Sequence, residues 1–347
     1  MNVPHAVLTT FIQGLFHAAG LPESDAACCA EIHVQQEMRG VTTHGLRHVP
    51  IGLDSLSKRR INPLPNRVVL RDQAATVVMD GDGGVGIAGC MDAMHRSMAK
   101  AKQFGIGIGI VIHSNHFLSA APYCLRAVEH GMIGICFSNT WASMGYPGTN
   151  VRAIANSPLG FGIPSTLAFP ILFDSALTTS AGKLSQWIRE GKTIPPALWG
   201  INAEGRQSSD PAAVLQGGTP WPIGGYKGAG LAVLVEMLTG VLGGGAFLHG
   251  IQPLELRTSK EKSESQCCIV IDVEKFMPLA AFRQRVAEFI GDLKSNPPAP
   301  DYTEILLPGE RAHRAYLGCL QAGVPLEADV AAHLRSWAGQ LQVAFPF

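Results

Sequence analysis

Charge is scarce in this sequence, and the two signs cancel. Lys, Arg, Asp and Glu make up 16% of the 347 residues, with 27 basic and 27 acidic side chains. A nucleic-acid-binding protein needs an excess of positive charge to neutralise phosphates, so a net charge of zero argues against nucleic acid as a partner. A small acidic substrate remains compatible with this charge, because one local Arg or His can hold a carboxylate.

Three other patterns are missing: a CxxC pair, a signal peptide and a long uninterrupted apolar run. The eight cysteines include two adjacent pairs, at 28–29 and 267–268, which suit neither a disulfide framework nor a zinc ribbon. No apolar segment of the signal-peptide kind follows the first residues. The longest apolar tract, 228–248, carries Glu236 and many glycines, which predicts a core helix and a loop rather than a membrane span. We therefore expect a cytoplasmic protein with reduced, buried thiols and no membrane segment.

The remaining sequence has 46% hydrophobic residues, enough for a large core, and its periodicity predicts an α/β (α+β) fold. Helices are predicted at 4–20, 23–39, 50–57, 87–104, 120–129, 178–190, 231–242, 282–293 and within 311–341. Strands are predicted at 68–70, 76–79, 106–112, 132–137, 159–164, 170–174 and 268–272. This order predicts a helical domain over 1–70, rejoined by 300–347, and an α/β domain over 71–299.

Two predicted strands end in polar clusters. The apolar run 106–112 is followed by His113, Ser114, Asn115 and His116, and the run 132–137 by Ser138, Asn139 and Thr140. Buried strands whose ends carry such side chains place them at a sheet edge, which is where ligands bind in α/β proteins. The long loop 141–157 that follows is of a length that usually has a function. The sequence therefore predicts that the floor of an active site lies here.

Histidines and an aspartate supply candidates for chemistry. Thr43 and His44 form either an acid/base group with a hydroxyl partner or a helix N-cap with an exposed residue after it. Arg47 and His48 follow, and a cation beside an acid/base group suits a carboxylate substrate. Asp174 ends an apolar run ahead of Thr178, and either orients a histidine or caps the next helix.

The pair His113 and His116 has a spacing seen in metal sites, but no Cys or carboxylate lies next to it in the sequence. A polar pocket wall is the alternative that we favour. No metal site is predicted.

Two glycine-rich segments resemble phosphate-binding loops. Residues 81–86 match G-x-G-x-x-G between a strand and a helix, but the next strand ends in His113 and not in an acid, so we interpret them as an ordinary turn. Residues 224–230, GGYKGAG, open a helix with free N–H groups and Lys227, although no Walker A motif is present.

Taken together, several motifs resemble one family. They run in order from about residue 38 to residue 325 and read RGVTTHGLRHVP, HSNHF, GMIGICFSNT, NSPLGFGIP, GKTIPPALWG, PIGGYKGAGLAVLVEMLTGVLGG and LPGERAHR. The sequence resembles the malate/L-lactate dehydrogenases of the non-Rossmann type. The same family includes ureidoglycolate, sulfolactate and diketogulonate enzymes and the reductases of Δ1-piperideine-2-carboxylate and Δ1-pyrroline-2-carboxylate.

The resemblance implies a non-Rossmann NAD(P)-binding α/β domain with a mixed sheet, and a homodimer. It implies hydride transfer between NAD or NADP and a small 2-oxo or 2-hydroxy acid, or a cyclic imino acid. His44, with Thr43 and Asp174, would be the acid/base group, and His116 would share that role or bind substrate. A catalytically weakened member that binds NAD(P) without efficient turnover is the alternative, and a metal hydrolase using His113 and His116 is a third.

The remaining site residues follow from the same resemblance. Substrate contacts are expected from Arg47, His48, Asn115 and Thr178. Cofactor contacts are expected from Asn139, Thr140, Asn156, Ser175, Ala176, Tyr226, Lys227, Leu307, Pro308 and Gly309.

Overall fold

A layer of helices from both ends of the chain forms one side of the molecule. The computed structural model describes residues 1–179, 184–195 and 200–347. Helices α1 (His5–Ala18) and α2 (Glu23–Met38) confirm the first two predictions, and α3 (Val49–Ser57) follows two 3₁₀ turns. Near the C-terminus, α10 (Glu310–Ala322) and α11 (Ala328–Gln340) contact α2 and α3, so this end does return to the N-terminal helices.

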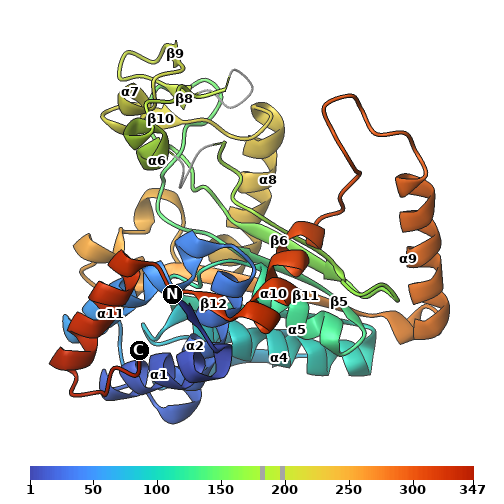
Figure 1. Cartoon of the computed structure of the whole chain (residues 1–347), viewed down its shortest axis with the longest axis horizontal. Coiled ribbons are helices and arrows are strands. Elements are labelled where there is room, and N and C mark those ends of the chain that lie inside the picture. The colour runs from blue at the N-terminus through green and yellow to red at the C-terminus, as the bar shows by residue number, and fades with distance from the viewer. Residues whose placement is uncertain (180–183, 196–199) are drawn as a thin grey trace.

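A two-stranded sheet that the sequence did not predict joins the termini. Strand β1 (Asn2–Val3) pairs antiparallel with β12 (Val324–Pro325), which interrupts the helical segment predicted over 311–341. The backbone of Met1 also bonds that of Leu326. At the C-terminal end, Phe345 and Phe347 contact Phe11 of α1, so both ends of the chain belong to the helical layer (Figure 1).

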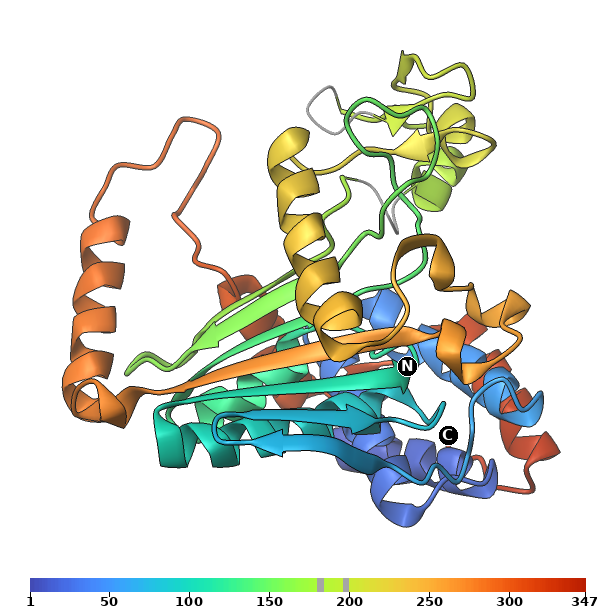
Figure 2. The same ribbon diagram turned by 180° about the vertical axis from the view of Figure 1, so that it is seen from behind.

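A seven-stranded sheet forms the centre of the molecule, in the order β2-β3-β4-β11-β5-β6-β7 (Figure 2). The strands are β2 (Val68–Gln73), β3 (Thr76–Asp80), β4 (Ile106–Ser114), β5 (Met132–Ser138), β6 (Leu159–Ile163), β7 (Ile171–Ser175) and β11 (Glu264–Asp272). Within the described chain, β3 and β4 form the one parallel pair of this sheet, and the other neighbours are antiparallel. The mixed sheet confirms the predicted α/β class and differs from a doubly wound parallel sheet.

Helices cover both faces of the sheet. Helices α4 (Gly86–Phe104) and α5 (Ala121–Glu129) pack on one face, with α1 and α2 behind them (Figure 2). Helix α8 (Tyr226–Glu236) and the π-turn after it cover part of the other face. Because side chains alternate along a strand, neighbouring residues join different cores: Cys268 packs with the α4 side, and Cys267 with the α8 side.

Glycines on the central strands let the helices approach closely. A Cβ at Gly109 would lie 2.6 Å from the carbonyl oxygen of Ala93 in α4, and one at Gly134 would lie 2.7 Å from the Cβ of Ala127 in α5. The alternation of glycine with isoleucine in 106–110 therefore places α4 directly against the backbone of β4, with isoleucine on the opposite face.

Replacement of Gly109 by alanine tests this packing. We expect it to lower the free energy of unfolding by about 1–3 kcal/mol, because the helix backbone must move to admit the methyl group. Chemical denaturation measures the change. Gly318→Ala is the matched control: this residue lies in α10 with nothing within 4 Å of the position that the added methyl group would take, and alanine there should be neutral or slightly stabilising. An unchanged midpoint for Gly109→Ala would contradict the close packing.

A small lobe lies above one end of the sheet in Figure 1. It holds a three-stranded sheet, β8 (Gly200–Ile201), β9 (Gln207–Ser208) and β10 (Thr219–Pro220), with helices α6 (Leu184–Arg189) and α7 (Pro211–Leu215). The helix predicted over 178–190 is wrong at its start, where Thr178 forms a β-bridge with Pro222; residues 180–183 of that prediction lie outside the described residues.

Three predicted elements begin three or more residues earlier in the structure than predicted. Helix α8 begins at Tyr226 and not at residue 231, because the glycine-rich run enters the helix after Gly225. Strand β11 begins at Glu264, four residues earlier than predicted, because it pairs along the full length of β4 and β5. Helix α9 (Leu279–Lys294) also starts three residues early, after Pro278.

The proposed division into two domains stays a prediction. One hydrophobic cluster contains side chains of α1, α2 and α11 together with α4, α5 and the sheet.

Helix α9 packs less closely than the other long helices. Figures 1 and 2 both show it standing apart from the main body, and Ile290 is its one buried residue.

Candidate active site

A cavity of about 370 Å³ lies where β4, β5 and β7 end beneath the small lobe. Volumes of this size are typical of small-molecule sites. Eight of the residues predicted for the site line it: His44, His116, Asn139, Thr140, Asn156, Asp174, Ala176 and Thr178. The polar ends of the two strands thus do form one wall, and His44 reaches it from the 3₁₀ turn Thr42–His44 in the helical layer.

Three imidazole rings gather at the inner wall of the cavity. The ring centroids of His44 and His116 are 5.7 Å apart, and those of His48 and His116 are 4.8 Å apart, with the rings nearly parallel. His48 is absent from the cavity lining and lies behind His116. Burial lowers the pKa of all three, to about 3 for His116. The rings are therefore neutral near pH 7, which allows them to stack without charge repulsion.

Hydrogen bonds orient the two histidines that line the cavity. The backbone N–H of Leu118 donates to Nδ1 of His116 at 3.3 Å, so neutral His116 carries its proton on Nε2. The Oγ1 atom of Thr43 lies 2.9 Å from Nδ1 of His44, a hydrogen bond that holds the orientation of the ring. His116 is thus a hydrogen-bond donor at Nε2, whereas Thr43, which can donate or accept, leaves both tautomers open to His44.

Asp174 caps a helix, though not the helix after it. Its carboxylate accepts N–H bonds from Ala120 (3.3 Å) and Ala121 (3.2 Å) at the start of α5. Burial raises the pKa of Asp174, and the bonds from Ser119 and these two amides oppose the rise. Asp174 lines the same cavity as His44, but its described hydrogen bonds run to α5 and its neighbourhood.

Two of the three predicted asparagines, Asn139 and Asn115, form hydrogen bonds with the backbone around the cavity. The amide of Asn139 donates to the carbonyl of Ala246 and accepts from Ser265, which ties β11 and the segment after α8 to β5. Asn115 donates to the carbonyls of Gly83 and Gly84 and does not line the cavity. The glycine-rich turn 81–86 is therefore held in packing contacts, as the interpretation of an ordinary turn expects.

Other predicted residues lie at the rim or outside. Thr178 lines the cavity and its hydroxyl donates to the carbonyl of Trp221, while the hydroxyl of Ser175 donates to the carbonyl of Ala176. Arg47 points away and pairs with Glu327 and Asp329. The remaining predicted residues do not line the cavity. Tyr226 and Lys227 are exposed at the start of α8. Leu307 is buried in a separate hydrophobic cluster, and Pro308 and Gly309 contact Leu172 of β7.

Comparison with known proteins identifies the relatives of this arrangement. A profile of the malate/L-lactate dehydrogenase family matches residues 3–335. The chain belongs to this family. Malate dehydrogenase of Pyrococcus horikoshii is 32% identical over 99% of this chain and 96% of its own length, and its solved structure superposes with a TM-score of 0.90. L-sulfolactate dehydrogenase of Methanocaldococcus jannaschii is 32% identical over 85% of this chain and 84% of its own. A Δ1-pyrroline-2-carboxylate/Δ1-piperideine-2-carboxylate reductase of Pseudomonas putida is 27% identical over 90% of each.

Membership of this dehydrogenase family makes the chain an oxidoreductase and implies a nicotinamide cofactor. Two buried atoms of the cavity wall fit such a polar ligand: Oδ1 of Asn156 and Oγ of Ser143 have no hydrogen-bond partner among the described residues. Buried polar atoms are normally satisfied, so a ligand amide and hydroxyl would complete them. Asn156 was predicted from the sequence, and Ser143 was not.

Sequence reasoning also missed Arg152, the one arginine of the described cavity lining. Its guanidinium donates to the carbonyls of Leu215 (3.3 Å) and Gly218 (3.4 Å) and lies over the ring of Trp141. These bonds leave N–H groups of the five-donor fork for an anion. In the sequence, the length of the loop 141–157 indicated that this segment has a function, but it did not indicate which residue contributes to the site.

Two further findings concern alternatives raised by the sequence. His113 lies 3.1 Å from Asp80 at the end of the neighbouring strand and does not line the cavity, whereas His116 does. In the described parts of the chain, no helix has the length and apolar character that crossing a membrane requires.

Proposed function

We propose that this family member transfers a hydride between NAD or NADP and a small 2-oxo or 2-hydroxy acid, or a cyclic imino acid. The observation that carries the proposal is the cavity itself, in which two neutral, oriented imidazoles lie on one wall and an arginine with remaining N–H donors belongs to the same lining. The bound nicotinamide would supply or accept the hydride. The residues of the chain then have to move one proton and hold one carboxylate.

His44 is the proposed proton donor and acceptor. Oxidation of an alcohol requires a neutral base, and reduction of a carbonyl requires its conjugate acid, so the group must exchange its proton near the working pH. Burial lowers the pKa of His116 to about 3, which makes its imidazolium too costly to form. Burial lowers the pKa of His44 as well, but Thr43 is placed to accept from its Nδ1–H when the ring is charged, whereas Nδ1 of His116 faces the N–H donor of Leu118. His116 would instead donate from Nε2 to the substrate oxygen.

Arg152 is the proposed partner of the substrate carboxylate. We expect Arg152→Met to raise KM for the acid substrate about 10- to 100-fold, since hydrogen bonds to a charged group contribute about 1.5–3 kcal/mol. Steady-state kinetics at saturating coenzyme measures the change. Arg206→Met, at an exposed position in the small lobe against which Arg152 packs, is the control. If only the coenzyme KM rises in Arg152→Met, the arginine holds the cofactor and not the substrate.

The pH dependence follows from the lowered pKa of His44. Neutral His44 is the base for oxidation, and it is lost as the pH falls through its pKa. We expect kcat/KM for the hydroxy acid to be level near pH 7 and to fall on an acid limb with its midpoint below 6.5. For reduction, kcat/KM should rise toward the same pH. A hydroxy-acid profile whose acid limb lies above pH 7 would argue against His44 as the base.

A turnover assay tests the function as a whole. Purified protein is mixed with NADH or NADPH and a panel of 2-oxo acids and cyclic imino acids, and oxidation of the reduced coenzyme is followed by its absorbance. Turnover of at least one compound supports the proposal. Tight coenzyme binding without turnover across the panel would favour the weakened, non-catalytic alternative.

We also propose a homodimer. Helix α8 and its π-turn expose a stripe of large apolar side chains, among them Leu231, Leu234, Met237 and Val241. Helix α9 adds Phe289 and Leu293 on an element that stands apart from the body (Figure 2). Monomers seldom expose so much apolar surface. Sedimentation equilibrium tests the proposal, and a monomer at micromolar concentration would refute it.

A cytoplasmic location is proposed from the thiols. All eight cysteines are unpaired, and six of them are buried. This pattern suits a reducing compartment. Fractionation of the native source cells would test it.

A further inference from the structure

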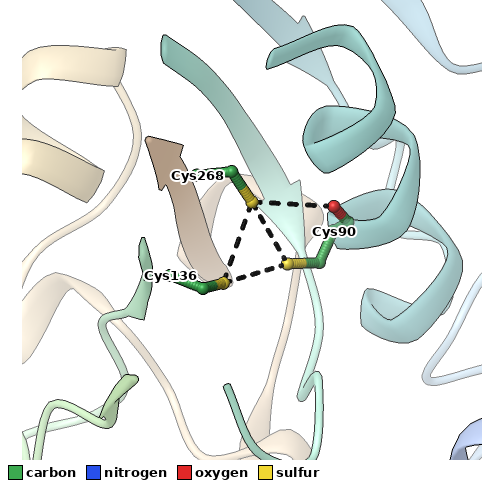
Figure 3. Close-up of side chains that lie close together, drawn as sticks. All are labelled: Cys90, Cys136 and Cys268. Atoms are coloured by element: carbon green, nitrogen blue, oxygen red, sulfur yellow. Dashed lines mark hydrogen bonds between the residues drawn. The ribbon is translucent and has the colours of Figure 1, made fainter. Parts of the chain in front are cut away.

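Three cysteines from separate elements meet on the face of the sheet that α4 covers. They are Cys90 of α4, Cys136 of β5 and Cys268 of β11, and each is fully buried. Their sulfur atoms form a nearly equilateral triangle with sides of 3.6, 3.8 and 3.8 Å (Figure 3). Cys136 and Cys268 are direct partners in the register of the two strands, so the backbone fixes their separation. The proposed dehydrogenase reaction uses none of them.

The triangle has the dimensions of a three-sulfur coordination site. The point equidistant from the three sulfurs is about 2.2 Å from each, close to a metal–thiolate bond of about 2.3 Å. An ion at or just out of the plane would reach all three without movement of the backbone. In the described chain, no fourth His, Cys, Asp or Glu ligand joins the group. The geometry therefore suits a three-coordinate centre.

The net charge of the complex limits which ions three buried thiolates can hold. The cluster lies in an apolar core, and its hydrogen bonds are to its own members and the carbonyl of Cys90. A divalent ion held by three thiolates would leave one buried negative charge, which low-dielectric surroundings disfavour. A trivalent centre held by three thiolates is neutral. Soft thiolate ligands also select soft, thiophilic elements.

We propose that Cys90, Cys136 and Cys268 form a binding site for a trivalent, three-coordinate thiophilic centre, for which arsenite is the probe. Three S–H bonds and three As–O bonds of As(OH)₃ break, three As–S bonds form, and three waters leave with the thiol protons. Arsenic remains trivalent, so the step needs no oxidant or reductant.

The three thiols are enclosed between α4 and the sheet, where each cysteine is fully buried. Because the site is closed, ligand entry requires local opening between α4 and the sheet, and binding should be slow.

The site lies next to the cavity through the strand backbone. Cys136 precedes Ser138 by two residues and Cys268 follows Gln266 by two, so each pair shares a face of the sheet. Gln266 donates to the hydroxyl of Ser138, which lines the cavity. A ligand bound to the thiols would therefore lie two residues along each strand from Ser138 and Gln266, beside the wall of the proposed active site.

Arsenic content measures the binding. Reduced full-length protein is incubated with arsenite for hours, separated from free ligand by gel filtration, and analysed for arsenic per chain. One arsenic per wild-type chain is expected, and loss of retained arsenic in Cys268→Ala and in Cys90→Ala. Cys267→Ala is the matched control, because this neighbour packs on the opposite face, and it should retain arsenic as the wild type does.

A spectroscopic measurement keeps the test independent of the variants. X-ray absorption of the wild-type complex should show three sulfur neighbours around arsenic, even if a variant fails to fold. The proposal is overturned if wild-type protein retains no arsenic, if arsenic has oxygen neighbours in place of one or more sulfurs, or if folded Cys268→Ala retains as much as Cys267→Ala. Preferential retention of cadmium over arsenite would overturn the assignment to a neutral trivalent centre.

Discussion

Replacement of His44 by alanine is expected to lower kcat about 100- to 10,000-fold in both directions, the range that a positioned acid/base group contributes. The ring lies in the cavity lining with Nδ1 held by Thr43, and alanine removes the imidazole that would exchange the proton. Coenzyme affinity, measured by the fluorescence of bound NADH or NADPH, should change little. Full activity in His44→Ala would remove this residue from the mechanism.

Two further variants distinguish the role of His44 from the roles of other histidines. His333→Ala, an exposed histidine of α11, controls for the substitution and should be fully active. His116→Gln keeps an N–H donor near the position of Nε2 and should raise KM more than it lowers kcat. If His116→Gln abolishes turnover while His44→Ala retains most of it, the roles of the two histidines are reversed.

Loss of Arg257 is expected to have the largest effect on stability. Its side chain is 5% exposed and pairs at 2.6 Å with that of Glu264, which is 7% exposed. It also donates to the side chain of Asn115 and to the carbonyl of Gln252. Arg257→Met leaves a buried carboxylate without its partner, which costs about 3–5 kcal/mol of the free energy of unfolding. Chemical denaturation at pH 7 measures the loss.

A double variant and a pH series test the cause. In Arg257→Met with Glu264→Gln the loss should be smaller than in the single variant, because no buried charge is left unpaired. Burial already raises the pKa of Glu264, and the Arg257 charge opposes that rise. Without Arg257 the carboxyl should take up a proton at a higher pH, so the stability deficit of Arg257→Met should shrink as the pH falls. A deficit that is independent of pH would point to lost packing instead.

The sequence was informative where a local pattern has one structural outcome. The apolar runs 106–112 and 132–137 became β4 and β5, and the polar residues after them reached the cavity through His116, Asn139 and Thr140. Asn115 belongs to the same cluster but points to the turn 81–86, because successive side chains at a strand end face different sides. Polarity alone does not reveal which side faces the ligand.

Features that depend on contacts between distant segments could not be predicted from local sequence patterns. Arg152 reaches the cavity because the loop 141–157 packs against the small lobe, and nothing in the order of its residues sets that direction. Asp174 was expected to serve the segment after it, yet its carboxylate bonds α5, over 50 positions earlier in the chain. The three-thiol cluster likewise depends on the register of β11 with β5, which only the assembled sheet defines.

The place of β11 in the sheet also constrains how the protein can be made. Strands β4 and β5 are consecutive, but β11 lies between them, and its Cys268 is 132 positions beyond Cys136. Until a ribosome has released residues 264–272, both β4 and β5 present unpaired, apolar edges. Pairing so distant in sequence is slow, and exposed edges of this kind template aggregation. A nascent chain of this protein should therefore depend on chaperones until its eleventh strand emerges.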